Sequence, residues 1–423
     1  MQPRLFFSRQ QISVTLATAL FALFVIMLPR YTDTAKIWFA LLILGATVYL
    51  AFNWRQLRQT SKLERIFFAV LIGNFTWIAF CYYVNGEPGR GSSFLWGRHF
   101  YLLFLIPLFF MFRSLKITDK TLVLVIVSSM LVSFVDIGLD LLQGVDHREQ
   151  GMNPNALGPI QLCFSGILFF YFLKLPQSAL RWIALGGAII GVATVALSLS
   201  RSTWITFIIL GTFFTFYLQR AQPLWKKWVA AVMILALFSA SYLIPLVKQR
   251  VDGISASVVS YFASSDHRDV ASLGTFGVRA ELWKTGWKIF LENPLTGAGV
   301  GGFQVMAKAN SERYQVNAVV GYVKYAHNQY IAALATRGLP GLILFLLFLA
   351  IPIYIAMSHS VFEYEAEVAR LSLLFICLNY AIGCLGEDHF EGKSATMFVA
   401  VFVALMLARL SRNDMDQPRG SPT

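Results

Sequence analysis

Two arginines and one histidine in this 423-residue chain have side chains that could carry group-transfer chemistry. Arg201 stands in "LSLSRSTW" and Arg279 in "TFGVRAELW". Guanidinium groups bind phosphoryl oxygens through paired hydrogen bonds and do not lose their charge. The two arginines together would therefore suit a pyrophosphate, although each alone is also typical of a snorkelling or solvated arginine at a helix end.

His327 is the candidate proton acceptor, in "YAHNQY", where Asn328 follows it as a further polar group. An imidazole has an unperturbed pKa near 6.5, so its neutral form can take a proton from a hydroxyl group near neutral pH. A lone histidine is as often structural as catalytic, and that alternative stays open on the residues alone.

Two further residues could bind a sugar or a phosphate. Asn155, in "GMNPNALGP", could donate hydrogen bonds, although Asn153 and Asn155 fit a turn followed by a helix N-cap equally well. Arg98 begins an apolar run and has the same two interpretations as Arg201.

Three other patterns receive structural interpretations. Asp136 and Asp140 lie four residues apart; we expect them to pair with a basic residue rather than form a cation or proton path. The segment 386–393, "GEDHFEGK", gathers four ionisable residues without the spacing of a zinc helix, so we predict a solvated loop and no metal site. The "GAGVGG" run (297–302) lacks the strand and the Lys-Ser/Thr ending of a nucleotide loop.

The elements that must position these side chains are membrane helices. The chain is 57% hydrophobic and 13% charged, against about 25% charged in soluble proteins. Long apolar runs recur throughout, and each could cross a hydrocarbon core about 30 Å thick. We predict an all-α polytopic membrane protein with about 12 transmembrane helices, the first of them retained. The runs lie at 11–29, 36–52, 64–84, 98–112, 120–143, 157–173, 182–200, 202–218, 228–247, 339–357, 367–385 and 395–410.

Basic residues are concentrated in alternate loops, which predicts that both termini lie in the cytoplasm. The net charge of +13 is then mostly a consequence of topology, and nucleic acid is not an expected partner. The long segment 248–338 would form a periplasmic loop containing short helices, the last of them ended by Gly338. The predicted layout is transmembrane helices 1–9 in 1–247, this loop, helices 10–12 in 339–410 and a disordered cytoplasmic tail in 411–423. Four cysteines fall in apolar runs and are predicted to be small buried side chains.

Three motifs occur in an order that resembles the superfamily of O-antigen ligases and polymerases. They are "SLSRSTW", then "R-x3-W-x3-W-x2-F-x3-PLTGAGVGGF", then "HNQYIAALATRGLPGL", with "NPNALG" upstream. The resemblance implies a GT-C-like membrane glycosyltransferase on the periplasmic side of a Gram-negative inner membrane. It implies a donor glycan on undecaprenyl pyrophosphate and, in the ligase branch, lipid A–core oligosaccharide as acceptor. Neither a metal nor a nucleotide cofactor is implied, and membrane lipids surround the protein.

Carried onto this chain, the resemblance makes His327 the general base on the acceptor hydroxyl. Arg201 and Arg279 would hold the donor pyrophosphate, so that attack inverts the anomeric carbon. Asn155, Arg98 and Asn328 complete the predicted substrate-binding set. One position departs from the pattern, because Arg337 stands where many relatives have an acidic residue; we expect a change in acceptor preference or in local pairing.

Three alternatives to the ligase remain at this point. An O-antigen polymerase would use the same donor with a second lipid-linked glycan as acceptor. A protein O-oligosaccharyltransferase would use a protein. A transporter or flippase would need ionisable groups on several spans; here the unusual polar residues cluster in outer segments, which favours an enzyme.

Overall fold

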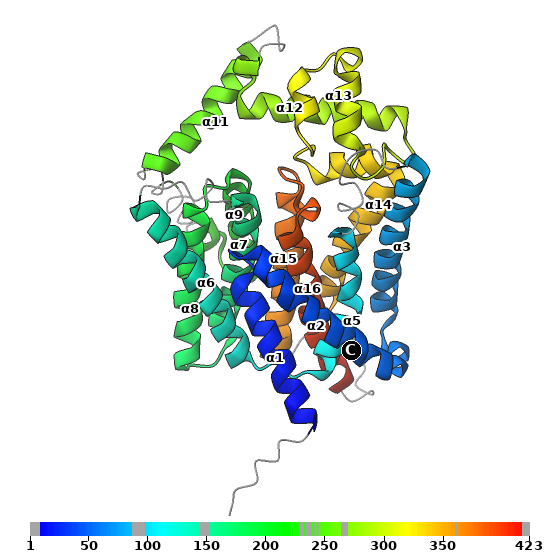
Figure 1. The fold of residues 1–423 in the computed structure, drawn as a ribbon. Helices are drawn as coiled ribbons and strands as arrows, with labels where there is room; N and C mark the ends of the chain where they lie inside the picture. The colour runs from blue at the N-terminus through cyan, green and yellow to red at the C-terminus, as the bar shows by residue number, and fades with distance from the viewer. Residues whose placement is uncertain are drawn as a thin grey trace, which may run out of the picture.

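The computed structural model describes residues 9–86, 98–143, 153–220, 222–228, 232, 239, 242, 245–263, 270–359 and 363–416. These residues are helical, and no strand occurs among them. Most helices pack side by side in a bundle, and α11, α12 and α13 form an arch over one end of it (Figure 1). Helix α1 begins and α16 ends at the opposite end, which agrees with the predicted placement of both termini on one side.

Long helices make up the bundle, and short 3₁₀ turns join several of them. The bundle elements are α1 (Arg9–Met27), α2 (Thr32–Phe52), η1 (Trp54–Gln59), α3 (Lys62–Asn85), η2 (Tyr101–Phe104), α5 (Leu105–Ser114), α6 (Asp119–Leu142), α7 (Pro154–Lys174), α8 (Ala179–Leu197), α9 (Arg201–Leu218), α14 (Gln329–Ser358), α15 (Tyr364–Gly383), η4 (His389–Glu391) and α16 (Lys393–Asp416). The arch elements are α11 (Pro245–Ala263), α12 (Val270–Glu292), α13 (Gly302–Tyr314) and η3 (Ala318–Tyr322).

The part of the chain that the structure describes contains nine helices long and apolar enough to cross a membrane. An all-helical polytopic membrane protein is therefore supported, whereas the predicted count of 12 spans is not reached. The predicted run 11–29 has a shorter described apolar helix, Val14–Met27, and the predicted span 228–247 lies largely outside the described residues. Helix α16 continues to Asp416, into the predicted tail; residues 417–423 lie outside the described residues.

The predicted span 98–112 stays a prediction. Residues 98–114 are helical throughout, but the 3₁₀ turn η2 interrupts the α-helical geometry and the α-helix after it, α5, has ten residues, so the run is not among the nine candidate spans. Phe109, Phe110 and Phe112 on α5 are all fully buried, and the helix packs against α2 and α16. An apolar run in a sequence indicates that its side chains are buried, and in α5 the neighbouring helices, rather than lipid, bury the three phenylalanines.

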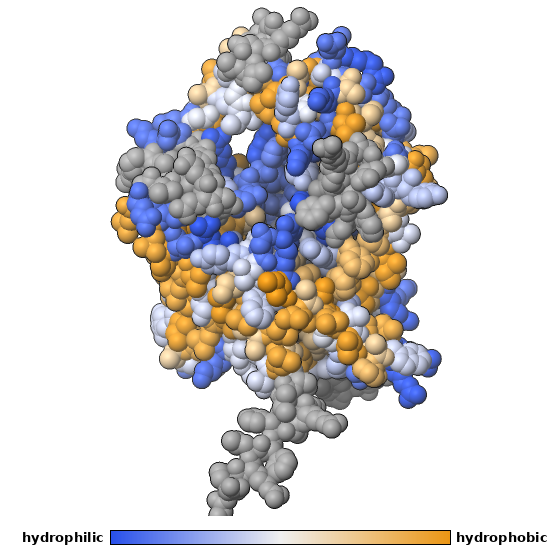
Figure 2. All heavy atoms as spheres, viewed as in Figure 1, coloured by the Kyte–Doolittle hydropathy of each residue, from blue (hydrophilic) through white to orange (hydrophobic). Residues whose placement is uncertain are grey.

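Helix α16 lies at the centre of the bundle, because every residue in its apolar window is buried inside the protein. Around it, the outer surface carries a belt of hydrophobic residues, and a hydrophilic hollow lies between the bundle and the arch (Figure 2). The hollow is where the polar residues singled out in the sequence could meet a substrate.

Two structural interpretations from the sequence are confirmed. Arg30 forms an ion pair with Asp136, and its Nη2 lies 3.7 Å from Asp140, so both carboxylates have the basic partner that we expected. The four cysteines are buried and free. Neither feature belongs to the candidate active site.

Glycine breaks α14 where the sequence predicted the end of a short helix. Gly338 has φ +65° and ψ −169°, a conformation that is non-helical and essentially confined to glycine. The turn after α12 packs on this break: Leu339 donates its N–H to the Pro294 carbonyl at 2.8 Å, and Ala298 donates to the Ala335 carbonyl at 2.8 Å. The "GAGVGG" run is therefore a turn that fits against the backbone of α14.

Replacing Gly338 with alanine is expected to destabilise the protein by about 3 kcal/mol, because strained backbone and a steric clash add. The new Cβ would lie 2.1 Å from the Leu295 carbonyl oxygen. Thermal unfolding in detergent would measure the loss. Gly45→Ala is the matched control, since a Cβ there meets nothing within 4 Å; equal melting temperatures for the two variants would contradict the assignment.

Candidate active site

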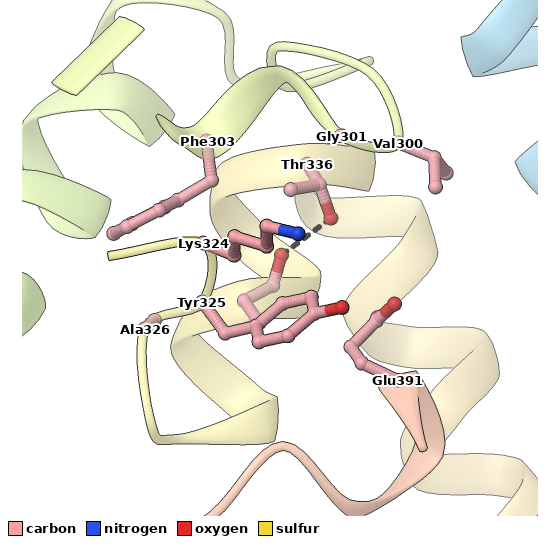
Figure 3. Close-up of a pocket in the computed structure, with 9 residues that line it drawn as sticks. Val300, Gly301, Phe303, Lys324, Tyr325, Ala326, Thr336 and Glu391 are labelled. Atoms are coloured by element: carbon pink, nitrogen blue, oxygen red, sulfur yellow. Dashed lines mark hydrogen bonds between the residues drawn. The ribbon is translucent and has the colours of Figure 1, made fainter. Parts of the chain in front are cut away.

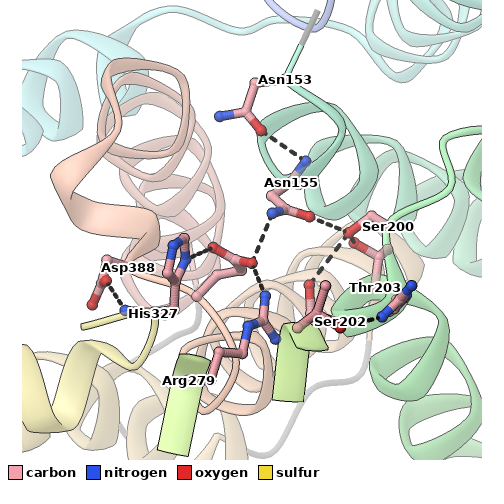
Figure 4. Close-up of polar contacts among 11 residues, drawn as sticks. Asn153, Asn155, Ser200, Ser202, Thr203, Arg279, His327 and Asp388 are labelled. Carbon is pink, nitrogen blue, oxygen red and sulfur yellow. Dashed lines mark hydrogen bonds and ion pairs between the residues drawn. The ribbon is translucent and has the colours of Figure 1, made fainter. Parts of the chain in front are cut away.

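Asn155, Arg279 and His327 lie together in a polar cluster (Figure 4), and each of them contacts the carboxylate of Glu387. Its Oε1 accepts a hydrogen bond from Asn155 Nδ2 at 2.7 Å and one from Arg279 Nη2 at 2.5 Å. Its Oε2 lies 2.9 Å from His327 Nδ1. One carboxylate, only 6% exposed, therefore connects three of the residues that the sequence proposed.

His327 is held by its backbone as well as by its ring. Its N–H donates to Asp388 Oδ2 at 2.5 Å, and its φ is +50°. Left-handed backbone is uncommon outside glycine, and such conformations persist where surrounding contacts impose them. A carboxylate can only accept, so Nδ1 carries the proton that binds Glu387, and Nε2 is left as the basic nitrogen of the neutral ring.

The pair shifts the protonation of both partners. The hydrogen bond to Glu387 raises the pKa of His327, which outweighs the opposing effect of burial. Burial works against ionised Glu387, but the contacts with His327 and Arg279 prevail and lower its pKa. Burial, with repulsion from Glu391, raises the pKa of Asp388 to about 7. The site thus combines a fixed carboxylate with a strengthened base.

Asn155 joins the N-termini of two helices. Its Oδ1 accepts from the hydroxyl of Ser200, the N-cap of α9, at 2.9 Å. Its own N–H donates to Asn153 Oδ1 at 3.0 Å, as expected of an N-cap asparagine at the start of α7. The turn-and-cap interpretation is confirmed for Asn153, whereas the side chain of Asn155 belongs to the Glu387 cluster.

The two arginines come from different elements beside this cluster. Arg201 is the first residue of α9, and its Nη1 donates to Thr275 Oγ1 on α12 at 2.9 Å. Arg279 lies one turn further along α12, with a third of its side chain exposed. A Cβ at Gly386 would meet both Ser202, the neighbour of Arg201 on α9, and the Arg279 Nη1, so the start of α9 and Arg279 approach the same glycine.

Two predicted binding residues make other contacts. Arg98 Nη1 donates to the Tyr325 hydroxyl at 3.2 Å and to the Glu391 carbonyl, away from Glu387. Asn328 is the N-cap of α14, and its Oδ1 accepts from the N–H groups of Tyr330 and Ile331. The side-chain oxygen of Asn328 is therefore used in capping the helix.

The prediction of a solvated loop at 386–393 is wrong. Glu387, Asp388, His389 and Glu391 are 5–9% exposed. Burial alone would raise the pKa of Glu391. The contact with His99, whose Nε2 lies 3.2 Å from Glu391 Oε1, outweighs this effect together with its other partners, and the pKa of Glu391 falls to about 2. Burial lowers the pKa of His389 to about 4. Charges in a short loop look solvated in a sequence, and only the packing of α14 and α16 around them reveals their burial.

Arg337, the departure from the expected pattern, is inside the protein. Its side chain is 1% exposed, and its carbonyl accepts from the Trp77 indole N–H at 2.8 Å. Among the described residues, Nε and Nη2 of its buried guanidinium group have no hydrogen-bond partner, so the structure does not show the local pairing that the sequence suggested. In the ranges that the structure describes, no group of three or more acidic, histidine or cysteine side chains is placed to hold a metal.

The fold and the site together define a polytopic membrane protein with a histidine–carboxylate pair and two arginines at the polar end of its bundle. A model of the O-antigen ligase family matches residues 186–346, a stretch that contains Arg201, Arg279 and His327. Through this stretch the chain is similar to the O-antigen ligase family, whose members are membrane glycosyltransferase-like ligases and polymerases.

One relative extends the similarity over most of the chain. An uncharacterized protein of Haemophilus influenzae is 22% identical over 351 residues, which are 81% of this chain and 84% of that protein. Both Asn155 and Glu387 lie outside the stretch that the family model matches. The contact of Glu387 with His327 therefore comes from the structure and not from the family match.

Proposed function

We propose that this protein is an O-antigen ligase. It would transfer O-antigen polysaccharide from undecaprenyl pyrophosphate to a sugar hydroxyl of lipid A–core oligosaccharide, at the periplasmic face of a Gram-negative inner membrane. The observation that carries the proposal is the 2.9 Å contact between His327 Nδ1 and Glu387 Oε2, beside Arg279. This arrangement suits a reaction that takes a proton from one substrate and releases an anion from the other.

His327 would activate the acceptor. Glu387 fixes the proton on Nδ1, so Nε2 takes the proton from the attacking hydroxyl. The hydroxyl oxygen bonds to the anomeric carbon while the bond from that carbon to the pyrophosphate oxygen breaks. Because attack and departure occur on opposite faces, the configuration inverts. The bonding electrons leave with undecaprenyl pyrophosphate.

The arginines would stabilise the leaving group. Two guanidinium groups can bind several phosphoryl oxygens at once and need no reorganisation if they are already held. Arg279 is held by Glu387 at 2.5 Å and Arg201 by Thr275 at 2.9 Å. Fixed cations of this kind can take the place of a metal ion, so the proposed reaction is metal-independent.

The position of the cluster fits two lipid-linked substrates. The hollow lies above the hydrophobic belt of the bundle (Figure 2), and the arch covers it from the other side (Figure 1). Glycans whose lipid anchors stay in the bilayer could reach this level from the side. A transporter would instead need a polar path along the spans.

The product distinguishes the ligase from its nearest alternative. Purified protein in nanodiscs, given lipid-linked O-antigen and lipid A–core, is expected to yield glycan attached to lipid A–core, in the presence of EDTA as well as without it. A product consisting of longer lipid-linked glycan, with the lipid A–core unmodified, would identify a polymerase. Nanodiscs without protein provide the background.

A further inference from the structure

A small cavity lies next to the candidate active site, and none of the residues in the Glu387 cluster lines it (Figure 3). It is formed by the turn before α13, the first turns of α14 and the segment just before His327. The lining includes Gly301, Phe303, Lys324, Tyr325, Thr336 and Glu391. The proposed function leaves this cavity without a role.

Lys324 places an ammonium group in this cavity (Figure 3). In the part of the chain that the structure describes, its Nζ forms no hydrogen bond or ion pair. The neighbouring Thr336 hydroxyl donates to the Ala332 carbonyl at 2.6 Å, so its proton is already used. Lys324 is exposed, so its ammonium group is open to solvent and to the cavity and is available to an anion that enters.

Tyr325 adds a hydrogen-bond donor. Its hydroxyl accepts from Arg98 Nη1 at 3.2 Å, so the hydroxyl proton can point elsewhere. Burial raises the pKa of Tyr325, which keeps that proton in place at neutral pH. The guanidinium group behind it supplies a second positive charge close to the cavity.

The acidic residue in the lining has hydrogen-bond partners of its own. Glu391 Oε1 lies 3.2 Å from His99 Nε2 and accepts from Gln329 Nε2 at 3.4 Å. Arg98 donates to the backbone carbonyl of Glu391, which places a guanidinium group beside this residue. Next to Glu391, the cavity offers a cation and a hydroxyl donor to whatever enters it.

We propose that this cavity is a subsite for an anionic substituent, a phosphate or a carboxylate, on the sugar that receives the glycan. The inference rests on the proposed function and adds a feature of the acceptor to it. Lys324 is three residues before His327, a reach of at most about 10 Å along the chain. One sugar unit could therefore put its anionic group beside Lys324 and its hydroxyl at His327.

The donor is not the expected occupant. Its pyrophosphate would be held by Arg201 and Arg279, and neither arginine lines the cavity. A glycan that attacks the anomeric carbon must approach away from the leaving group. The cavity suits the acceptor better, because residues 324–326, which precede His327 directly, line it.

The test compares two acceptors with two proteins in nanodiscs of zwitterionic lipid. One acceptor is intact lipid A–core oligosaccharide; the other has had its phosphates removed enzymatically and its carboxylates esterified. With the intact acceptor, Lys324→Met is expected to raise the acceptor KM about tenfold, the usual effect of losing one charged hydrogen bond. The donor KM and kcat should stay within about twofold, and Lys324→Arg should resemble the unmodified protein.

The charge-stripped acceptor completes the comparison. It should raise the KM of the unmodified protein to the level of the variant, with no further effect of Lys324→Met. An unchanged KM in the variant, or an equal rise with both acceptors, would overturn the subsite. So would an effect of Lys324→Met that appears only when anionic lipids are added to the nanodiscs, since that would assign the cavity to a lipid headgroup.

Binding without transfer separates this inference from the proposed function. Calorimetry with delipidated core oligosaccharide, intact and charge-stripped, tests the subsite even if no ligated product forms. Preference for the intact form that Lys324→Met and Tyr325→Phe each reduce would support the subsite. Equal binding of the two forms by the unmodified protein would refute it, whatever the reaction proves to be.

Discussion

Replacing His327 with alanine is expected to lower the rate of glycan transfer by about 10²–10⁴-fold, the usual contribution of a general base. The imidazole is the basic group that lies within the cluster while remaining partly exposed, at 35% of its side chain. Glu387, at 8%, is buried and already accepts three contacts. Transfer can be measured as labelled O-antigen appearing on lipid A–core in nanodiscs.

The control must separate loss of the base from loss of the fold. His327 has a left-handed backbone, which asparagine adopts more readily than alanine does. His327→Asn should therefore keep the backbone bond to Asp388 and the melting temperature, yet lose the same activity. If either variant retained full activity in a correctly folded state, His327 would be excluded as the base.

Replacing Glu387 with glutamine is expected to lower kcat about 10- to 100-fold, because hydrogen bonds to charged groups contribute about 1.5–3 kcal/mol. The same change should move the pH dependence. Glu387 raises the pKa of His327, so the unmodified enzyme should gain activity as pH rises through a value above about 6.5. Without the carboxylate the pKa of His327 falls. The rise of activity with pH, which is the acidic limb of the pH–rate profile, should then occur at lower pH, although the maximum rate is smaller.

A matched substitution tests whether the pH shift is specific. Glu292 pairs with Arg313 at 2.5 Å and accepts a hydrogen bond from the Tyr314 hydroxyl at 2.7 Å, and neither contact involves His327. Glu292→Gln removes the same charge and should leave both kcat and the acidic limb in place. An acidic limb in Glu387→Gln that coincides with the unmodified one would show that Glu387 does not tune His327.

The same pair links folding stability to pH. The pKa of His327 is raised on folding, so its stabilisation is complete below about pH 6.5 and is lost as pH rises through the folded value. The pKa of Glu387 is lowered, so its stabilisation is complete above about pH 4.3 and is lost as pH falls through the folded value. The pair therefore stabilises the fold most between these limits.

The helical architecture could be predicted because apolar runs of bilayer length, repeated along a chain, are typical of membrane-spanning helices. The count of spans could not, since the run 98–112 contains the short helix α5 and is not among the nine candidate spans of the described residues. The break at Gly338 was predictable from "RGLPG", because glycine and proline interrupt helices for local reasons. What the sequence did not indicate is that the "GAGVGG" turn packs against that break.

The residues of the candidate site could be singled out in the sequence only where a residue type is rare beside membrane segments. Arginine and histidine beside membrane segments are costly to place, so Arg201, Arg279 and His327 stood out. Glu387 did not, because an acidic segment with a glycine at each end is typical of a solvated loop. Its role depends on contacts between residues 60 to 232 positions apart in the chain, and no local pattern encodes such contacts.

The late position of Glu387 has a consequence for the making of the protein. Arg201, Arg279 and His327 are all translated before α15, whereas Glu387 follows it and precedes the final helix. A nascent chain therefore acquires Arg279 and His327 before it acquires the carboxylate that contacts both of them. A chain truncated after α14 would contain the proposed base without the carboxylate that orients it.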